Sequence, residues 1–293
     1  GPRRPAPPAR SQLRDGRPSR PRSPRACRPG SSRGCRSCVP DNPVAGVMGT
    51  VARNGVPPAR TIRPLRGARL LGREKPGEAR EAGMAPRAMV FDIGNVLVAW
   101  RPEALYARLI TDDAARARFF SEICPPEWNA RFDRGEPMPE GVEAHAEANP
   151  EHAELIRAWW TRWPEMFGPA IEGSIACLRA LKAKGTPVFA LTNFAAETFA
   201  LAQEMYPVLT EFDGAVVSAH VRRNKPEPEI YAALEAMAGV PPEALFFADD
   251  LLANVRAARA RGWTAHHFRG ATGLRQALIE SGLLAPHEAP APD

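Results

Sequence analysis

The segment MVFDIGNVLVAWRP, residues 89–102, contains the pattern that decides the fold class of this chain. The short apolar run Ala88–Phe91, which overlaps it, ends at Asp92 and is followed by Gly94 and Asn95. Four consecutive apolar residues that stop at a turn-forming pair are typical of a strand buried on both faces. The segment therefore predicts a buried strand that ends at Asp92.

Two further apolar runs repeat this pattern, a shorter and a weaker strand candidate follow them, and helical patterns lie between. The strand candidates are Val188–Leu191 before Thr192 and Asn193, Ala215–Ser218, Leu245–Ala248 before Asp249 and Asp250, and Thr264–Phe268. The helix candidates are Ser174–Lys184, Ala195–Met205, Pro228–Ala238, Leu251–Arg261 and Gly273–Ser281. All-apolar strands that alternate with helices predict an α/β fold, a doubly wound, Rossmann-like parallel sheet with helices on both faces.

One stretch interrupts this alternation. From about Pro102 to Phe167 the chain has no strand candidate, only a helical pattern rich in Ala, Glu, Arg and Trp. About 65 residues are too many for a loop in a compact domain. We therefore predict an α/β core over residues 87–101 and 168–284, an inserted α-helical cap domain over residues 102–167, and a flexible tail over residues 285–293.

The first 86 residues differ in composition from the rest of the chain. They hold 19 Arg and Lys against 5 Asp and Glu, a net charge of +14, whereas the remaining 207 residues carry −8. They also contain 15 Pro and 11 Gly. Such a segment buries too little apolar surface to offset its chain entropy, so residues 1–86 are expected to form a disordered basic extension.

Basic extensions of this kind can bind nucleic acid or anionic lipid, but no nucleic-acid partner is expected for the acidic core. The extension lacks the apolar run of a secretory signal, and its prolines disfavour the amphipathic helix of a transit peptide. Because Met48, Met84 and Met89 lie downstream of Gly1, we interpret it as an over-extended gene start or untranslated leader. Residues 1–83 are accordingly expected to be dispensable.

The five cysteines form no disulfide framework. Cys35 and Cys38 make one CxxC near Cys27, a weak zinc or redox pattern without a second pair or a histidine. Cys124 and Cys177 stand in apolar contexts and are expected to be core residues. This usage favours a reducing, cytoplasmic compartment. No run approaches the roughly 18 apolar residues of a membrane span, so no membrane association is expected.

Polar residues follow the strand candidates at the places where a parallel sheet binds its ligands. In chain order these residues are Asp92, Thr192, Lys225 in a loop, and the pair Asp249 and Asp250. A carboxylate can attack phosphorus, a hydroxyl and an ammonium can hold phosphate oxygens, and an acidic pair suits Mg²⁺. Each residue alone could be a turn, cap or loop residue, but the set together favours phosphoryl chemistry.

Four segments resemble the motifs of the haloacid dehalogenase superfamily, in the same order. They are residues 89–102, 190–194 (ALTNF), 224–231 (NKPEPEIY) and 246–263 (FFADDLLANVRAARARGW). The resemblance covers about residues 87–284, and the helical insertion lies where the family's first type of cap belongs. Gly-Asn-Val after the nucleophile is similar to the sugar-phosphatase-like branch. The resemblance implies a Mg²⁺-dependent phosphatase that hydrolyses a small phosphorylated metabolite through an aspartyl-phosphate.

The resemblance also implies a role for each matching residue. Asp92 would be the nucleophile and would ligate Mg²⁺ together with the backbone carbonyl of Gly94. Asp249, with Asp250 beside it, would complete the metal site.

The remaining motif residues would hold the substrate, a small-molecule phosphate ester. Thr192 and the amide of Asn193 would bind the phosphoryl group, and Lys225 would neutralise the charge on the phosphate and the nucleophile. Trp100, Trp128 and Phe132 either shape substrate access at the cap or, as we prefer, are buried core aromatics.

Two positions depart from the family pattern. Many phosphatases of the family carry a second Asp two residues after the nucleophile as general acid and base, and here that position is Gly94. Ala253 stands where a distal Asp often lies. Without the acid, turnover should fall steeply as the leaving-group pKa rises, unless the cap or the substrate supplies the proton. A glycine there is also compatible with a turn that needs positive φ.

Three alternatives stay open at this point. A 2-haloacid dehalogenase would use the same Asp92 and needs no proton for a departing halide, but it has no need of the acidic pair. A receiver domain also combines Asp, Thr and Lys, but its acidic pair comes first in the chain and it has no cap. A catalytically weak, binding-only relative is the third alternative, which metal-dependent release of phosphate from an aryl phosphate would discriminate.

Overall fold

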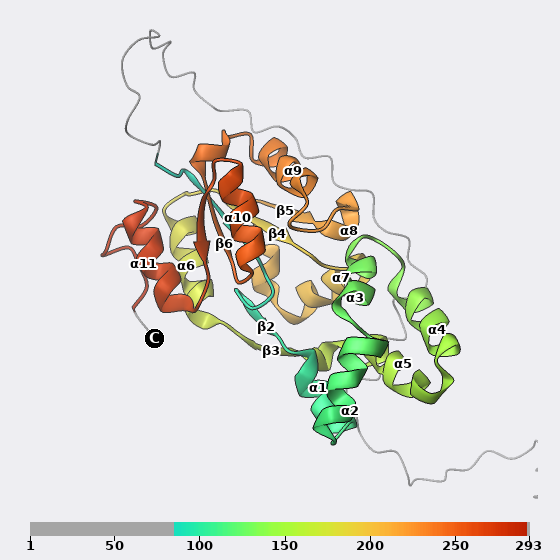
Figure 1. Ribbon diagram of the computed structural model, residues 1–293. Coiled ribbons are helices and arrows are strands. Elements are labelled where there is room, and N and C mark those ends of the chain that lie inside the picture. The colour runs from blue at the N-terminus through green and yellow to red at the C-terminus, as the bar shows by residue number, and fades with distance from the viewer. Residues whose placement is uncertain (1–84, 292–293) are drawn as a thin grey trace, which may run out of the picture. The chain divides into compact units, whose positions relative to one another are not determined.

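The computed structural model describes residues 85–291, and its central feature is a five-stranded parallel sheet (Figure 1). The strands are β1 (Ala88–Phe91), β4 (Val188–Thr192), β5 (Gly214–Val217), β6 (Leu245–Asp249) and β7 (Thr264–His267), in the order β5-β4-β1-β6-β7. The chain winds to one side of β1 and then to the other, with every neighbouring pair parallel. The predicted doubly wound, Rossmann-like sheet is therefore confirmed.

The two faces of β1 belong to two separate hydrophobic cores. Met89 and Phe91 pack with residues of α6 and α11, whereas Ala88 and Val90 pack with residues of α9 and α10. All four strand residues are fully buried. Side chains alternate between the faces of a strand, so both faces must be apolar when helices cover both. This is why the strand sequence is apolar throughout.

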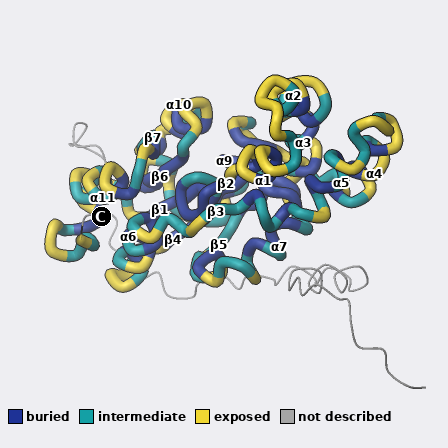
Figure 2. Tube along the Cα trace, turned by 90° about the horizontal axis from the view of Figure 1, so that it is seen from below, coloured by how far each residue is buried: buried dark blue, intermediate teal, exposed yellow. Residues whose placement is uncertain are grey.

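The core helices lie within two residues of their predicted bounds. They are α6 (Glu172–Ala183), α7 (Ala196–Met205), α9 (Pro228–Ala238), α10 (Leu252–Ala260) and α11 (Ala271–Glu280). The short α8 (Ser218–Val221) was not predicted, and it begins at Ser218, where the sequence predicted the end of a strand. Figure 2 shows buried residues along the strands and on the inner sides of the helices.

Residues 102–161 form the second group of helices (Figure 1). These are α1 (Pro102–Leu109), α2 (Asp113–Arg118), α3 (Pro126–Asp133), α4 (Met138–Ala148) and α5 (Ala153–Thr161), with a π-helical turn over Phe119–Ile123. The predicted core aromatics Trp128 and Phe132 are buried here, and Trp100 is half-buried. Cys124 and Cys177 are buried, which confirms the prediction for both thiols.

Two short strands that the sequence did not predict connect this helical segment to the sheet. β2 (Val98–Trp100) pairs antiparallel with β3 (Phe167–Ala170). They escaped prediction because β2 has only three residues and β3 contains Gly168 and Pro169, which interrupt any apolar alternation. The pair places the entry and the exit of the helical segment side by side.

The end of the described chain packs on the core. Lys184 pairs with Glu288 at 2.8 Å, and Arg275 donates to the carbonyl of Pro290 at 2.6 Å. The predictions for the basic extension and its CxxC lie outside the described residues. Within residues 85–291, none of the helices has the length and apolar character needed to traverse a bilayer.

Gly135, just after α3, is a point of close approach between the helical segment and the core. Its φ of +87° is left-handed, and a Cβ built there would lie 2.7 Å from the carbonyl oxygen of Ala219 in α8. We expect Gly135→Ala to lower the unfolding free energy by about 1–2 kcal/mol through the backbone and by a further ~1–3 kcal/mol through this contact.

Gly185→Ala is the matched control in denaturant unfolding. Gly185 has a φ of +81° but no atom within 4 Å of the added Cβ, so only the backbone cost applies. Equal losses of unfolding free energy in the two variants would contradict the close approach at Gly135.

Candidate active site

Three strands end at one edge of the sheet beside polar side chains. Asp92 follows β1, Thr192 ends β4 and Asp249 ends β6. The carboxyl ends of these adjacent strands lie together where the winding of the chain reverses, the usual ligand-binding position of an open parallel sheet. A cavity of about 520 Å³ opens there and is lined by Asp92 and Thr192, as well as Lys225 and Asp250.

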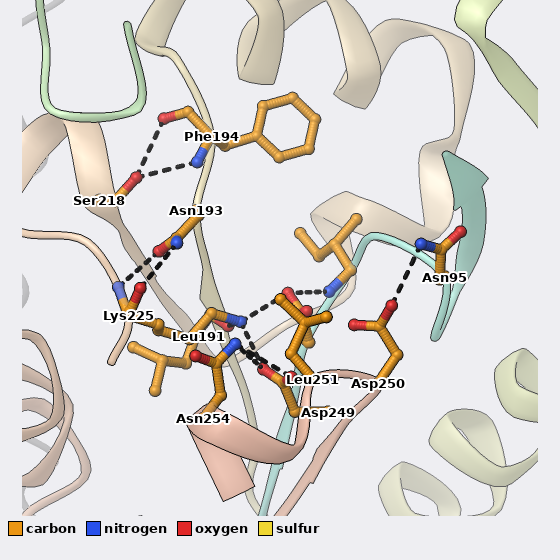
Figure 3. Close-up of polar contacts among 12 residues, drawn as sticks. Asn95, Leu191, Asn193, Phe194, Ser218, Lys225, Asp249, Asp250, Leu251 and Asn254 are labelled. Atoms are coloured by element: carbon orange, nitrogen blue, oxygen red, sulfur yellow. Dashed lines mark hydrogen bonds and ion pairs between the residues drawn. The ribbon is translucent and has the colours of Figure 1, made fainter. Parts of the chain in front are cut away.

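Lys225 lies at the centre of this site and is almost completely buried (Figure 3). Its Nζ lies 2.8 Å from Asp92 Oδ1 and 2.8 Å from Asp249 Oδ2, and it donates to the carbonyl of Leu191 at 2.8 Å. Three acceptors match the three donors of an ammonium. Burial alone would lower the pKa of Lys225, but Asp249 and Asp92 raise it above its ordinary value. Lys225 is therefore charged at neutral pH.

The backbone of Lys225 is held by the side chain of Asn193. The N–H of Lys225 donates to Asn193 Oδ1 at 2.7 Å, and Asn193 Nδ2 donates to the Lys225 carbonyl at 3.1 Å (Figure 3). Asn224, the residue before Lys225, donates from its side chain to the carbonyl of Ala130 in α3 at 2.9 Å. The loop that carries Lys225 is thus tied to both the sheet edge and the helical segment.

Asp92 is only 7% exposed, yet it lines the cavity. Its Oδ1 accepts from the N–H of Ile93 at 2.7 Å in addition to the contact with Lys225. Among residues 85–291, none donates a hydrogen bond to Oδ2, so this oxygen is open to a ligand. Burial raises the pKa of Asp92 above its ordinary value; Lys225 opposes this rise and Asp249 adds to it.

Asp249 is fully buried, and both of its oxygens are engaged (Figure 3). Oδ1 accepts from the N–H of Leu251 at 2.8 Å and from Asn254 Nδ2 at 3.0 Å. Oδ2 accepts from Lys225 and, at 3.0 Å, from the same amide of Asn254. The carboxylate is therefore fixed in place by a saturated set of donors.

Asp250 is half-buried and has fewer partners than its neighbour. Its Oδ2 accepts from Asn95 Nδ2 at 3.1 Å, and it forms no ion pair with a described residue. Burial raises its pKa, which the hydrogen bond from Asn95 opposes. Asp92, Asp249 and Asp250 each present a carboxylate oxygen within 4.8 Å of the others. Carboxylate oxygens that converge in this way suit a divalent cation.

Thr192 is the remaining predicted residue at the cavity. Its side chain is 1% exposed and lines the cavity, and its hydroxyl makes no hydrogen bond to any residue of the described part of the chain. The hydroxyl is thus left to the cavity, where a ligand or water can accept its proton. Thr192 is therefore positioned to donate to a bound anion.

The turn after Asp92 differs from one sequence-based expectation. The left-handed residue is Asn95, with φ of 55°, and Gly94 is not among the residues with positive φ. The nearest atom to a Cβ built on Gly94 would be Trp100 Cβ at 3.9 Å, an ordinary contact. The Asn95 side chain stabilises the turn by accepting from the N–H of Trp100 at 2.9 Å. The conformation of the turn does not require glycine at position 94.

Sequence reasoning missed three side chains at the site. Asn254 donates to both oxygens of Asp249, and Asn95 links the first turn to Asp250. Asp133 lines the cavity from α3. A buried Asn on the apolar face of α10 was a usable signal, because burial demands hydrogen-bond partners. Asp133 had no such signal, since an acidic residue in a polar helical stretch normally faces solvent.

The chain belongs to the haloacid dehalogenase-like hydrolases, whose family model matches residues 86–262. It is thus a hydrolase, as the motifs predicted. Its order of strands, with the polar residues at their carboxyl ends, agrees with this assignment.

Particular relatives agree with the family. The sesquiterpene phosphatase astK of Aspergillus oryzae is 28% identical over 184 residues, which cover 62% of this chain and 89% of the relative. A haloacid dehalogenase family enzyme of Bacteroides thetaiotaomicron shares the fold, with a TM-score of 0.51 and 19% identity over 64% of this chain and 95% of that one. Its wild-type complex with magnesium and inorganic phosphate matches with a TM-score of 0.50 and 18% identity, covering 63% and 95% of the two chains.

Removal of the buried ammonium tests its role in holding the site together. Lys225→Met leaves Asp92 and Asp249 buried without a counterion, so we expect the unfolding free energy to fall by about 3–5 kcal/mol. The measurement is urea unfolding near neutral pH. Lys184→Met, which breaks the partly exposed pair with Glu288, is the control and should cost at most about 1 kcal/mol. Similar losses in both variants would contradict the central role of Lys225.

Proposed function

We propose that this hydrolase is a Mg²⁺-dependent phosphatase that uses Asp92 as its nucleophile. The observation that carries the proposal is the placement of Lys225, 2.8 Å from both Asp92 and Asp249, beside a cavity lined by Thr192. A fixed cation, an open carboxylate oxygen and an unpartnered hydroxyl suit the transfer of a phosphoryl group. The similarity to a phosphatase supports the same activity.

In the proposed reaction, the carboxylate of Asp92 attacks phosphorus and the ester bond breaks. The product is an aspartyl-phosphate, which water then hydrolyses to inorganic phosphate and the free carboxylate. Thr192 and the backbone amide of Asn193 would hold the phosphoryl oxygens. Lys225 would neutralise part of the negative charge that gathers on them, and because it is already held in place, it needs no reorganisation.

The acidic cluster fits the proposed metal ion. Three carboxylates and one ammonium leave the site with a net charge of −2, which a divalent cation would neutralise. Asp92 and Asp250 would hold Mg²⁺, together with the carbonyl of Gly94 that the family resemblance implies. Asp249 is the weaker candidate for a direct ligand, because both its oxygens are saturated. Bound Mg²⁺ supplies charge neutralisation for the phosphoryl group. A dehalogenase would have no use for this cluster.

The residues that line the cavity favour a substrate that carries an apolar organic group. Trp100, Trp163, Phe167 and Phe194 line it, and Leu251, one of the few large apolar side chains exposed in residues 85–291, stands at the same cavity with 57% exposure. Aromatic walls with a few convergent polar groups suit the recognition of an apolar ligand that carries one charged end. A sesquiterpene phosphatase among the relatives supports this substrate class. Residues 102–167 would act as the cap over it.

Asp92→Asn tests the nucleophile. The substitution keeps the shape of the side chain but removes the attacking oxygen anion, so phosphate release should fall by about 10³–10⁶-fold. Acid-quenched protein should carry a covalent phosphate in the wild type and none in the variant. A circular dichroism spectrum like that of the wild type controls for folding. Undiminished phosphate release by the variant would disprove the mechanism.

A comparison of Asp250→Asn with Asp249→Asn tests the proposed metal ligands. Asp250→Asn should weaken Mg²⁺ binding, measured by calorimetry, by at least the roughly 10–100-fold that outer-shell changes typically cost. Its stability without metal should stay near that of the wild type. Asp249→Asn should instead lower the unfolding free energy without metal by about 3 kcal/mol, because Lys225 loses a buried partner. The opposite pattern would exchange the roles of the two residues.

A further inference from the structure

The proposed phosphatase reaction needs a proton donor that the sheet edge does not provide. Departure of an alkoxide is slow unless an acid protonates it, and general acid–base help is typically worth about 10²–10⁴-fold. Position 94, two residues after the nucleophile, is glycine. The four carboxylic acids that line the cavity are Asp92, Glu103, Asp133 and Asp250. With Asp92 and Asp250 already assigned, Glu103 and Asp133 remain, and both belong to the helical segment.

These two acids differ in their surroundings. Glu103 lies on α1 and is exposed to solvent, whereas Asp133 is the half-buried last residue of α3. A carboxylate at a helix C-terminus meets the negative end of the helix dipole, which favours its neutral, protonated form. Burial raises the pKa of Asp133 to about 7, although the hydrogen bond from Asn129 and the charge of Lys225 lower it.

The side chain of Asp133 is oriented by a short hydrogen-bonded chain. Trp159 Nε1 donates to Asn129 Oδ1 at 3.0 Å, and Asn129 Nδ2 donates to Asp133 Oδ2 at 3.2 Å. Because an indole can only donate, it settles which end of the Asn129 amide faces Asp133. The second oxygen of Asp133, Oδ1, accepts no hydrogen bond from any described residue.

The charge of Lys225 acts on Asp133, but this ammonium is itself paired with Asp92 and Asp249. The arginines nearest in sequence form ion pairs with other residues, Arg131 with Glu136 and Arg134 with Glu227. Asp133 itself forms no ion pair among residues 85–291. An acid that is oriented, half-buried and without an ion pair, and that lines the same cavity as Asp92, is placed to meet a leaving group.

We propose that Asp133 is the general acid and base of this enzyme, supplied by the helical segment in place of the acid missing at Gly94. In the first step, Asp92 forms its bond to phosphorus, the ester P–O bond breaks, and the leaving oxygen takes the proton of Asp133 and departs as an alcohol. In the second step, water gives a proton to the Asp133 carboxylate as it attacks phosphorus. The bond from phosphorus to Asp92 breaks, and inorganic phosphate leaves with both acids restored.

The test is a comparison of leaving groups with the full chain in Mg²⁺. We would measure kcat/KM for 4-nitrophenyl phosphate, whose leaving group departs unaided, and for octyl phosphate, whose leaving group needs a proton. Asp133→Asn and Asp133→Ala should each lose about 10²-fold or more on octyl phosphate and less than about tenfold on the aryl ester. Both variants should also show a burst of nitrophenolate, because hydrolysis of the aspartyl-phosphate slows without the base.

Two controls also replace an acid by its amide. Glu147→Gln removes an exposed carboxylate of α4 outside the cavity and should leave both substrates unaffected. Glu103→Gln should not produce the selective loss; if it does so and the Asp133 variants do not, Glu103 is the acid and the inference is overturned.

The remaining outcomes separate this inference from the proposed function. Equal losses of kcat/KM on both esters by the two Asp133 variants, or no loss on either, would overturn the role of Asp133 while leaving the phosphatase standing. A wild-type protein that hydrolyses neither ester in Mg²⁺ would overturn the proposed function and this inference together.

Discussion

The three contacts of the buried Lys225 ammonium hold the ends of three strands in one arrangement. Its bonds to Asp92, Leu191 and Asp249 join β1, β4 and β6 at their carboxyl ends. Two carboxylates this close together in a buried site would repel one another and resist ionisation without a cation between them. Lys225 therefore both stabilises the edge of the sheet and keeps Asp92 in position with one oxygen open.

The order of strands makes this arrangement possible. The four contributing segments are far apart in the chain, but β1 lies between β4 and β6, so their ends meet at the point where the winding reverses. The apolar strands are buried under helices on both faces, which makes the sheet a rigid support. The side chains at its edge are then held in place by short hydrogen bonds to backbone and amide groups.

The helical segment supplies what the sheet edge lacks. It contributes Pro126, Met138 and the acid Asp133 to the cavity, whose aromatic walls come from β2, β3 and the segments beside them and whose sheet edge is strongly charged. Asn224, beside Lys225, donates to the backbone of α3, so the loop that carries the central cation contacts the helix that carries Asp133. The chemistry we propose is accordingly divided between two parts of the chain: the sheet edge holds the phosphoryl group, and the helical segment meets the organic group.

The strands and the motif residues at their ends could be predicted from the sequence, because a strand buried on both faces must be apolar throughout and must stop where a polar turn begins. The core helices could be predicted from the spacing of their apolar residues, because the face of a helix that packs on the sheet must be apolar. The β2–β3 pair could not be predicted, since strands this short carry no period.

Only the tertiary structure showed that Asn254 saturates Asp249, that Asn95 rather than Gly94 adopts the left-handed turn, and that Asp133 faces the cavity. Such positions depend on how separate elements pack, and a helical period reveals which face of a helix is apolar but not what its polar residues meet.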